Sequence, residues 1–284
     1  MITVFRLLAR CSLATLHRLG ALLGWLVWCA SPTYRRHLRE NTQLALGAAA
    51  AGRVRNATIA HAGRTSLELP RLWLHPLDET VRLVREVRGW EYVEAAQAAG
   101  KGILFMTPHL GCFEVTAQYY SHRAPISVLY RPPKQAWLQT MIEEGRARPQ
   151  LQLAPADLSG VRTLLKALRR GEAVGMLPDQ APRRGEGRWI DFFGRPAYTM
   201  TLAAKLSESG AAVVLAWGER LPDGEGYRLH FMPPASPVTG TLEERAFAIN
   251  REMERIILQC PEQYLWGYNR YKRRRGTEPA PESD

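Results

Sequence analysis

Short apolar runs alternate with amphipathic stretches over most of the chain after residue 80. A run of four or five bulky apolar residues between Gly or Pro is typical of a buried strand, and apolar positions three and four residues apart are typical of a helix. We therefore expect strands at residues 81–87, 103–106, 126–130, around 151, 173–177, 212–217 and 227–232, and helices at 90–99, 111–120, 135–146, 159–170, 201–209 and 242–259. Strands that alternate with helices predict an α/β fold, a mostly parallel mixed sheet covered by helices.

The first 32 residues have a different pattern, and we expect them to form an N-terminal membrane anchor helix. Residues 19–30 are uncharged, but this run is shorter than the roughly 20 residues that cross a bilayer. Arg6, Arg10 and His17 fall on one side of a helix, which favours an amphipathic helix in the plane of the membrane. A core helix of the main domain is the alternative.

The main domain is expected to span residues 33–275. Two helices precede its first strand, the second of them over residues 54–73 and ended by Pro76. The tail, residues 276–284, is polar and rich in Pro, so we expect it to be disordered.

The charge balance indicates an anionic partner. Lys and Arg outnumber Asp and Glu by 38 to 27, a net charge of +11, which suits nucleic acid, an acidic protein or a phosphate-bearing membrane surface. The chain contains no aromatic-basic RNA-binding block and no zinc-finger spacing, which disfavours nucleic acid. Its four cysteines form no Cys-x-x-Cys pair, so neither a metal site nor a disulfide framework is expected.

Candidate chemistry follows the apolar strand at residues 103–106, where His109 comes just after Pro108 and Glu114 follows five positions later. In an open α/β sheet, ligand sites gather at this carboxyl edge of the strands. An imidazole there can take a proton from an alcohol, while a carboxylate on its other nitrogen fixes the tautomer. The same spacing is equally typical of a helix-capping histidine and a solvated glutamate.

Further polar side chains follow the next two apolar strands. Arg131 comes directly after residues 126–130 and can hold a phosphate or oppose an oxyanion, although a surface arginine beside a turn fits equally well. Asp179 and Gln180 follow residues 173–177 and repeat this geometry. Their carboxylate and amide groups can orient an arginine or bond a substrate hydroxyl.

Three other groups have both a functional and a structural interpretation. Asp157 suits a substrate site and equally suits the N-cap of the helix that follows it. The loop at residues 181–188 contains Arg183, Arg184 and Arg188, which can bind an anionic sugar lipid or face solvent. A basic run near the C-terminus can meet anionic headgroups, and it consists of Arg270, Lys272, Arg273, Arg274 and Arg275.

Several ordered blocks carry a family resemblance. Residues 103–114 resemble the His-x4-Asp/Glu block of the lysophospholipid acyltransferase superfamily. Five further blocks follow in the order found in the late (lauroyl/myristoyl) acyltransferases of lipid A biosynthesis, namely residues 128–132, 157–160, 177–180, 192–194 and 261–266. The resemblance covers nearly the whole chain, up to residue 275.

This resemblance implies an O-acyltransferase at the cytoplasmic face of the inner membrane, with His109 as general base and Glu114 as its orienting partner. By the same resemblance, the donor is an acyl thioester on acyl carrier protein and the acceptor is a hydroxyl of a lipid A precursor. Thioester activation calls for no metal and no other cofactor.

Two alternatives remain open from the residues themselves. One is an acyltransferase of the same superfamily that acts on another lipid, such as a lysophospholipid, a mannoside or an ornithine lipid. The other is a non-catalytic membrane-surface protein that binds anionic lipid, although the presence of both His109 and Glu114 disfavours it.

Overall fold

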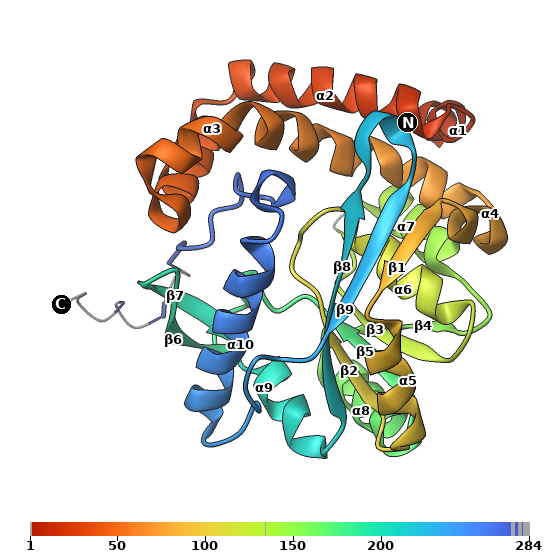
Figure 1. Ribbon diagram of the computed structural model, residues 1–284, viewed down its shortest axis with the longest axis vertical. Helices are drawn as coiled ribbons and strands as arrows, with labels where there is room; N and C mark the ends of the chain where they lie inside the picture. The colour runs from red at the N-terminus through yellow and green to blue at the C-terminus, as the bar shows by residue number, and fades with distance from the viewer. Residues whose placement is uncertain (1, 134, 274–275, 278–279, 281–284) are drawn as a thin grey trace.

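A computed structural model describes the chain except for residues 1, 134, 274–275, 278–279 and 281–284 (Figure 1). Among the described residues, the main sheet has seven strands in the order β1-β9-β8-β2-β5-β3-β4. Their bounds are Val84–Arg88 (β1), Ile103–Met106 (β2), Ile126–Tyr130 (β3), Leu151–Pro155 (β4), Ala173–Met176 (β5), Ala212–Arg220 (β8) and Tyr227–Met232 (β9). Every pair of neighbours is parallel except β8 and β9. The predicted mostly parallel mixed sheet is confirmed, with β1 at one edge.

Helices cover both faces of this sheet, as predicted (Figure 1). They are α5 (Trp90–Ala98), α6 (Phe113–Ser121), α7 (Ala136–Arg146), α8 (Leu158–Arg169), α9 (Leu202–Leu206) and α10 (Leu242–Ile257). Successive side chains of a strand point to opposite faces of the sheet. All four residues of β2 are buried, so both of its faces are covered. Leu104 and Met106 belong to the core beneath α8 and α10, whereas Ile103 and Phe105 belong to the core beneath α5 and α6.

A separate hairpin, β6 (Gly187–Phe192) and β7 (Arg195–Met200), was not predicted. Its first residues lie in the segment that the sequence marks as a basic, Gly-containing loop. Two residues connect the strands, Phe193 at φ 52° and Gly194 at φ 71°. Asn-Gly is the usual signal for such a turn, and here Phe193 stands in the place of Asn, with its ring packed against Trp266. The usual signal for a hairpin is therefore missing from the sequence.

The N-terminal part forms a helical layer across one end of the molecule (Figure 1). It comprises α1 (Ile2–Ala9), α2 (Leu13–Ala30), α3 (Pro32–Leu74) and the unpredicted short helix α4 (Leu77–Arg82). The two helices expected over residues 33–77 are two parts of α3, which breaks at Gly47, where φ is 74°. Since α4 occupies the first positions of the expected strand at 81–87, β1 begins later, at Val84.

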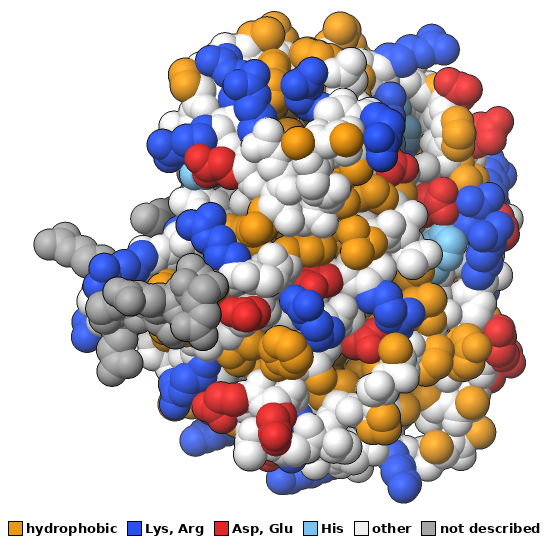
Figure 2. All heavy atoms as spheres, turned by 60° about the vertical axis from the view of Figure 1, so that its left-hand side comes forward, with side chains coloured by type: hydrophobic (Ala, Val, Ile, Leu, Met, Phe, Trp, Pro, Cys, Tyr) orange, Lys and Arg blue, Asp and Glu red, His pale blue; other side chains and the backbone are white. Residues whose placement is uncertain are grey.

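Helix α2 packs along α3 through glycines. A Cβ atom on Gly63 would overlap the backbone of Gly20 and Gly24, so only glycine allows this close approach. The opposite face of α2 is apolar and exposed, with Leu22 63% and Leu26 67% accessible. Hydrophobic and basic side chains gather at this end of the molecule (Figure 2). Among the described helices, α2 alone has the length and apolar composition of a candidate membrane span.

The C-terminal predictions are only partly covered by the structure. Arg274 and Arg275 of the basic run lie outside the described residues, as does most of the tail, residues 276–284. The expected disorder of that tail therefore stays a prediction.

Candidate active site

The strand order brings the predicted site residues to one edge of the sheet. His109 follows β2, Asp179 follows β5, Arg131 follows β3 and Asp157 follows β4. These four strands are consecutive neighbours and parallel, so their carboxyl ends share an edge. This arrangement agrees with the expectation for an α/β sheet.

His109 is held by Asp179. The imidazole Nδ1 lies 2.8 Å from Asp179 Oδ1, and the backbone N–H of His109 donates to Oδ2 at 3.0 Å. The hydroxyl of Tyr264 donates to the same Oδ2 at 3.1 Å. Burial by itself raises the pKa of Asp179, but the His109 and Tyr264 contacts outweigh it and leave the pKa below its usual value. An ionised Asp179 thus fixes the orientation of the imidazole.

Glu114 has different partners from those expected. Its carboxylate accepts two hydrogen bonds from the Arg146 guanidinium, one from Nε at 2.9 Å, and a third from the indole N–H of Trp73 at 3.3 Å. The expected catalytic role of Glu114 stays a prediction, but in this structure Asp179, and not Glu114, contacts the His109 imidazole. The physical reason is that Glu114 lies in the first turn of α6 and contacts side chains of α3 and α7.

Arg146 is a residue that sequence reasoning missed. It ends a predicted helix, where a basic residue is expected merely to complement the helix dipole. In the structure its guanidinium lies 5.7 Å from the ring centres of both Trp73 and Tyr130, and it is largely buried with Glu114. No spacing in the sequence connects these two residues, because they lie on different helices, 32 positions apart.

The turn that carries His109 is fixed by backbone hydrogen bonds with residues 263–265. The backbone N–H of Leu265 donates to His109 O at 3.2 Å, and Gly111 N–H donates to Gln263 O at 3.1 Å. Gly111 has φ 57°, and a Cβ atom on it would overlap the carbonyl oxygen of Gly218. Glycine is therefore required at this position.

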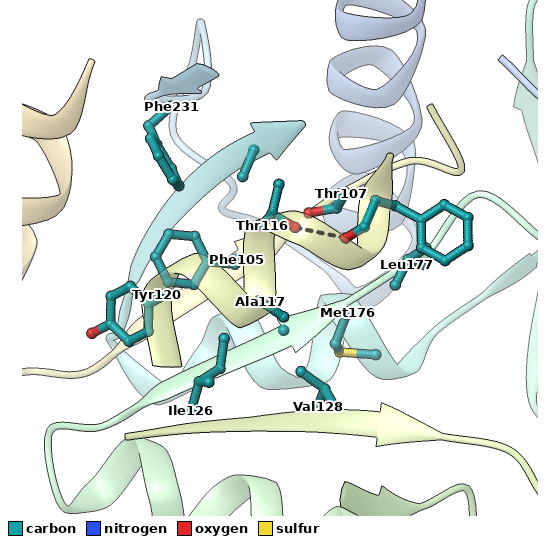
Figure 3. A pocket seen from close by; sticks show the side chains of 13 residues that line it. Phe105, Thr107, Thr116, Ala117, Tyr120, Ile126, Val128, Met176, Leu177 and Phe231 are labelled. Carbon is teal, nitrogen blue, oxygen red and sulfur yellow. Dashed lines mark hydrogen bonds between the residues drawn. The ribbon is translucent and has the colours of Figure 1, made fainter. Parts of the chain in front are cut away.

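An apolar cavity of about 30 Å³ lies next to the turn that carries His109, and Figure 3 shows the side chains that line it. Its lining includes Thr107 and Leu177. Thr107 comes two positions before His109, and Leu177 comes two positions before Asp179. So does Phe113, whose ring meets the imidazole edge to face at 5.0 Å. The remaining wall is apolar and includes Ala117, Tyr120, Ile126, Val128, Met176 and Phe231. An imidazole, its carboxylate partner and an apolar pocket are thus adjacent.

Comparison with known proteins identifies the family. The sequence model of the family described as bacterial lipid A biosynthesis acyltransferase matches residues 1–273. The chain belongs to this family.

Individual relatives agree with this assignment. The acyltransferase is 33% identical over 218 residues to the lipid A biosynthesis lauroyltransferase of Escherichia coli (strain K12), an alignment covering 75% of this chain and 69% of the relative. It is 29% identical over 226 residues to the palmitoleoyltransferase of the same strain, covering 78% of this chain and 71% of the relative. Its activity is acyl transfer in lipid A biosynthesis, which favours this lipid over the alternative acceptors.

The other predicted site residues of the acyltransferase occupy different places. Arg131 is 43% exposed, lies 3.8 Å from Glu186, and lines a surface groove of about 450 Å³ together with Asp157 and Arg183. Asp157 caps α8, since its carboxylate accepts from the N–H of Ser159 at 2.8 Å. The structure thus supports the capping interpretation of Asp157 while placing it at the groove.

The remaining predicted side chains are Gln180, Arg184 and Arg188. Gln180 is half-buried beside Asp179, and Arg184 is exposed. Arg188 lies 3.5 Å from Glu243 on the surface.

The position of Arg270 differs from the prediction that it meets an anionic headgroup. It is 3% exposed, and its guanidinium donates to Tyr198 O at 2.9 Å and to Thr199 Oγ1 at 2.7 Å. It also lies over the ring of Phe192 at 4.9 Å. Because Arg270 is enclosed by the β6–β7 hairpin, it is unavailable to a lipid headgroup, and its role is to fasten the C-terminal segment to this hairpin.

Proposed function

We propose that this acyltransferase moves a fatty acyl chain from acyl carrier protein to a hydroxyl of a lipid A precursor, at the cytoplasmic face of the inner membrane. The observation that carries the proposal is the His109–Asp179 pair, with an Nδ1 to Oδ1 distance of 2.8 Å, beside an apolar pocket. Together these features supply a base and a place for the start of an acyl chain.

His109 acts as the general base in this proposal. With Nδ1–H donating to Asp179, the neutral imidazole presents Nε2 as its acceptor. Nε2 takes the proton of the acceptor hydroxyl while the hydroxyl oxygen bonds to the thioester carbonyl carbon. The carbon–sulfur bond then breaks, and the departing thiolate receives the proton from the imidazolium. Asp179 stabilises the imidazolium between these two steps.

The apolar pocket supports the assignment of an acyl donor. At about 30 Å³ it holds little more than one or two water molecules, so an entering chain must displace its lining side chains. Met176 forms part of that lining, and an unbranched thioether side chain adapts to such changes at low cost.

Surface charge supports the two polar partners. Arg131 and Arg183 line the groove at the carboxyl edge, where guanidinium groups suit the phosphates of a lipid A precursor. The net charge of +11 suits an acidic carrier protein and an anionic membrane surface. The exposed apolar face of α2 supports attachment to that membrane.

The test is turnover of purified protein with acyl carrier protein thioester and a lipid A precursor, measured by mass spectrometry. We expect His109→Ala to lower the rate by about 10²–10⁴-fold, the usual contribution of a general base. His122→Ala is the matched control, because His122 has an exposed side chain at the end of α6. A folded His109→Ala protein with near-parental turnover would remove the base assignment. Equal rates with acyl-coenzyme A would remove the assignment of the carrier-bound donor.

A further inference from the structure

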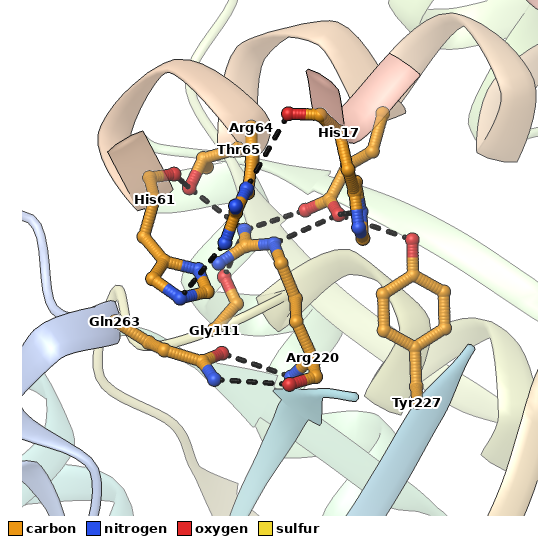
Figure 4. Close-up of polar contacts among 9 residues, drawn as sticks. His17, His61, Arg64, Thr65, Gly111, Arg220, Tyr227 and Gln263 are labelled. Carbon is orange, nitrogen blue, oxygen red and sulfur yellow. Dashed lines mark hydrogen bonds and ion pairs between the residues drawn. The ribbon is translucent and has the colours of Figure 1, made fainter. Parts of the chain in front are cut away.

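A buried ionic network lies behind the turn that carries His109 (Figure 4). Its centre is Arg220 at the end of β8, whose side chain is 0% exposed, as is that of Glu68 on α3. Arg220 Nε donates to Glu68 Oε2 at 2.8 Å, and Nη2 donates to Oε1 at 2.6 Å. Burial raises the pKa of Glu68, but the Arg220 charge outweighs it and lowers the pKa to about 2. Both groups are therefore charged at neutral pH.

The network reaches the turn at Gly111. Arg220 Nη2 lies 2.7 Å from Gly111 O, while Gly111 N–H donates to Gln263 O at 3.1 Å. The Gln263 side chain in turn binds the backbone of Arg220, with its Oε1 2.8 Å from Arg220 N and its Nε2 3.1 Å from Arg220 O. Both polar backbone groups of Gly111 are thus held by one closed set of contacts. Gly111 is two residues from His109, so these contacts hold the backbone of the turn close to the imidazole.

The same network includes the membrane-facing helix. His17 on α2 places Nε2 3.2 Å from Glu68 Oε2, and the hydroxyl of Tyr227 on β9 donates to this oxygen at 3.1 Å. Glu68, on α3, therefore connects α2 and β9 to the arginine that holds the turn. The chain of contacts runs from His17 through Glu68 and Arg220 to Gly111.

We infer that Arg220 is a positioning residue for His109, fixed by Glu68 and tied through His17 to the helix that meets the membrane. The inference rests on the proposed role of His109 as base. Arg220 binds the turn and not the reacting atoms, so its effect on the reaction passes through the orientation of the imidazole.

Energetics favour this role over a purely structural one. A buried ion pair gains little net stability over well-packed apolar side chains, because both charges lose their hydration. An apolar pair in the same space would leave Gly111 O without its donor, and an unsatisfied buried carbonyl costs about 1–3 kcal/mol. Only an arginine has a planar guanidinium that can donate to the Glu68 carboxylate and to Gly111 O at the same time.

The experiment compares Arg220→Lys with Arg228→Lys. Arg228 lies on the adjacent strand β9 and pairs with Glu86 and Glu219 near the surface, which makes it a matched control. We expect Arg220→Lys to lower kcat by about 10–100-fold, the effect of a small misplacement of a catalytic group, with KM nearly unchanged. Arg228→Lys should leave both parameters close to those of the parent. A folded Arg220→Lys protein with parental kcat would overturn the inference.

A second measurement reports the geometry without relying on activity. In ¹⁵N-histidine NMR spectra, the Nδ1–H signal of His109 is assigned by its loss in His109→Ala. We expect this signal to shift or disappear in Arg220→Lys and to stay in place in Arg228→Lys. An unchanged signal in folded Arg220→Lys would contradict positioning, whereas an active His109→Ala would contradict only the proposed function.

Milder variants cover the case in which Arg220→Lys does not fold. Tyr227→Phe and His17→Gln each alter one contact of Glu68 and leave the ion pair in place. We expect each to reduce kcat several-fold and to shift the His109 signal in the same direction. Folded variants with parental kcat and an unchanged signal would again overturn the inference.

Discussion

At the scale of single residues, the two buried carboxylates of the site have different partners and should respond differently to neutralisation. Asp179 contacts the backbone and ring of His109, whereas Glu114 contacts Arg146 and Trp73. Asp179→Asn keeps the shape but removes the charge that stabilises the imidazolium, so we expect kcat to fall by about 10²–10⁴-fold with little change in stability. The measurement is kcat together with the free energy of unfolding.

Glu114→Gln is the counterpart, and its main effect should be on folding. It leaves the Arg146 guanidinium, whose side chain is 20% exposed, without its carboxylate, which should destabilise the protein by roughly 2–4 kcal/mol. If Glu114→Gln instead loses kcat at parental stability while Asp179→Asn keeps its activity, Glu114 is the partner that the reaction uses.

These residues show how far the sequence predicts the site. His109 and Asp179 were both expected at the carboxyl edge because each follows an apolar strand. Their pairing was not expected, since it depends on β2 and β5 being neighbours in the sheet, and alternation along the chain does not specify strand order. Glu114 is closer to His109 in sequence, but the first turn of α6 places it among other partners.

A half-buried histidine, His61, provides a pH test at the same scale. Burial, followed by the nearby charges of Arg220 and Arg64, lowers the pKa of His61 from 6.5 to about 3. Between these two pH values the unfolded chain binds a proton that the folded protein does not. The folded state therefore loses up to about 1.4 kcal/mol per pH unit as the pH falls.

His61→Gln should remove this contribution, because the Gln amide oxygen can still accept from Arg64, which lies 3.1 Å from His61 Nε2. Between pH 7 and pH 5 we expect the variant to lose about 2 kcal/mol less unfolding free energy than the parent. Urea unfolding at the two pH values measures this difference, with His122→Gln as an exposed control. Equal losses in parent and His61→Gln would show that His61 does not titrate in this way.

At the scale of elements, the contact between α2 and α3 depends on glycines. Gly63→Ala places a Cβ atom against the backbone of Gly20 and must move the helices apart, so we expect a loss of stability of about 2 kcal/mol or more. Gly52→Ala, in the same helix, meets no atom within 4 Å and should stabilise the protein by about 0.5–1 kcal/mol. Thermal unfolding compares the two. Similar effects of the two substitutions would mean that α2 is not closely packed on α3.

The elements themselves were largely predictable where local patterns decide them. The strand at residues 126–130 and the helix beginning at Trp90 agree closely with β3 and α5. The missed elements lack such patterns. α4 has only six residues, and the β6–β7 turn uses Phe193 at positive φ, where the rings of Phe192 and Trp266 stabilise it.

At the scale of the whole molecule, the position of α2 bears on how the protein meets a membrane. Helix α2 packs along α3, and the part of α3 beneath it carries Arg64 and Glu68. If α2 crossed a bilayer in this arrangement, these charged residues would enter the hydrocarbon with it, at a cost of several kcal/mol. The structure therefore favours an α2 that lies in the plane of the membrane, with its exposed apolar face toward the lipid.

Charges on that face should release the protein without disturbing the fold. Leu22 and Leu26 are exposed and lie on one side of α2, and burying two such side chains in lipid contributes about 3 kcal/mol or more. We expect Leu22→Glu/Leu26→Glu to weaken binding to anionic vesicles by about 100-fold, as measured by flotation. Phe247→Glu, at an exposed apolar position on α10, should bind like the parent.

Basic side chains should retain some binding of the double variant at low salt. High salt should remove this remainder, because charges are screened beyond about 10 Å at 0.1 M. Undiminished, salt-resistant flotation of the folded double variant would place the membrane contact on another face of the molecule.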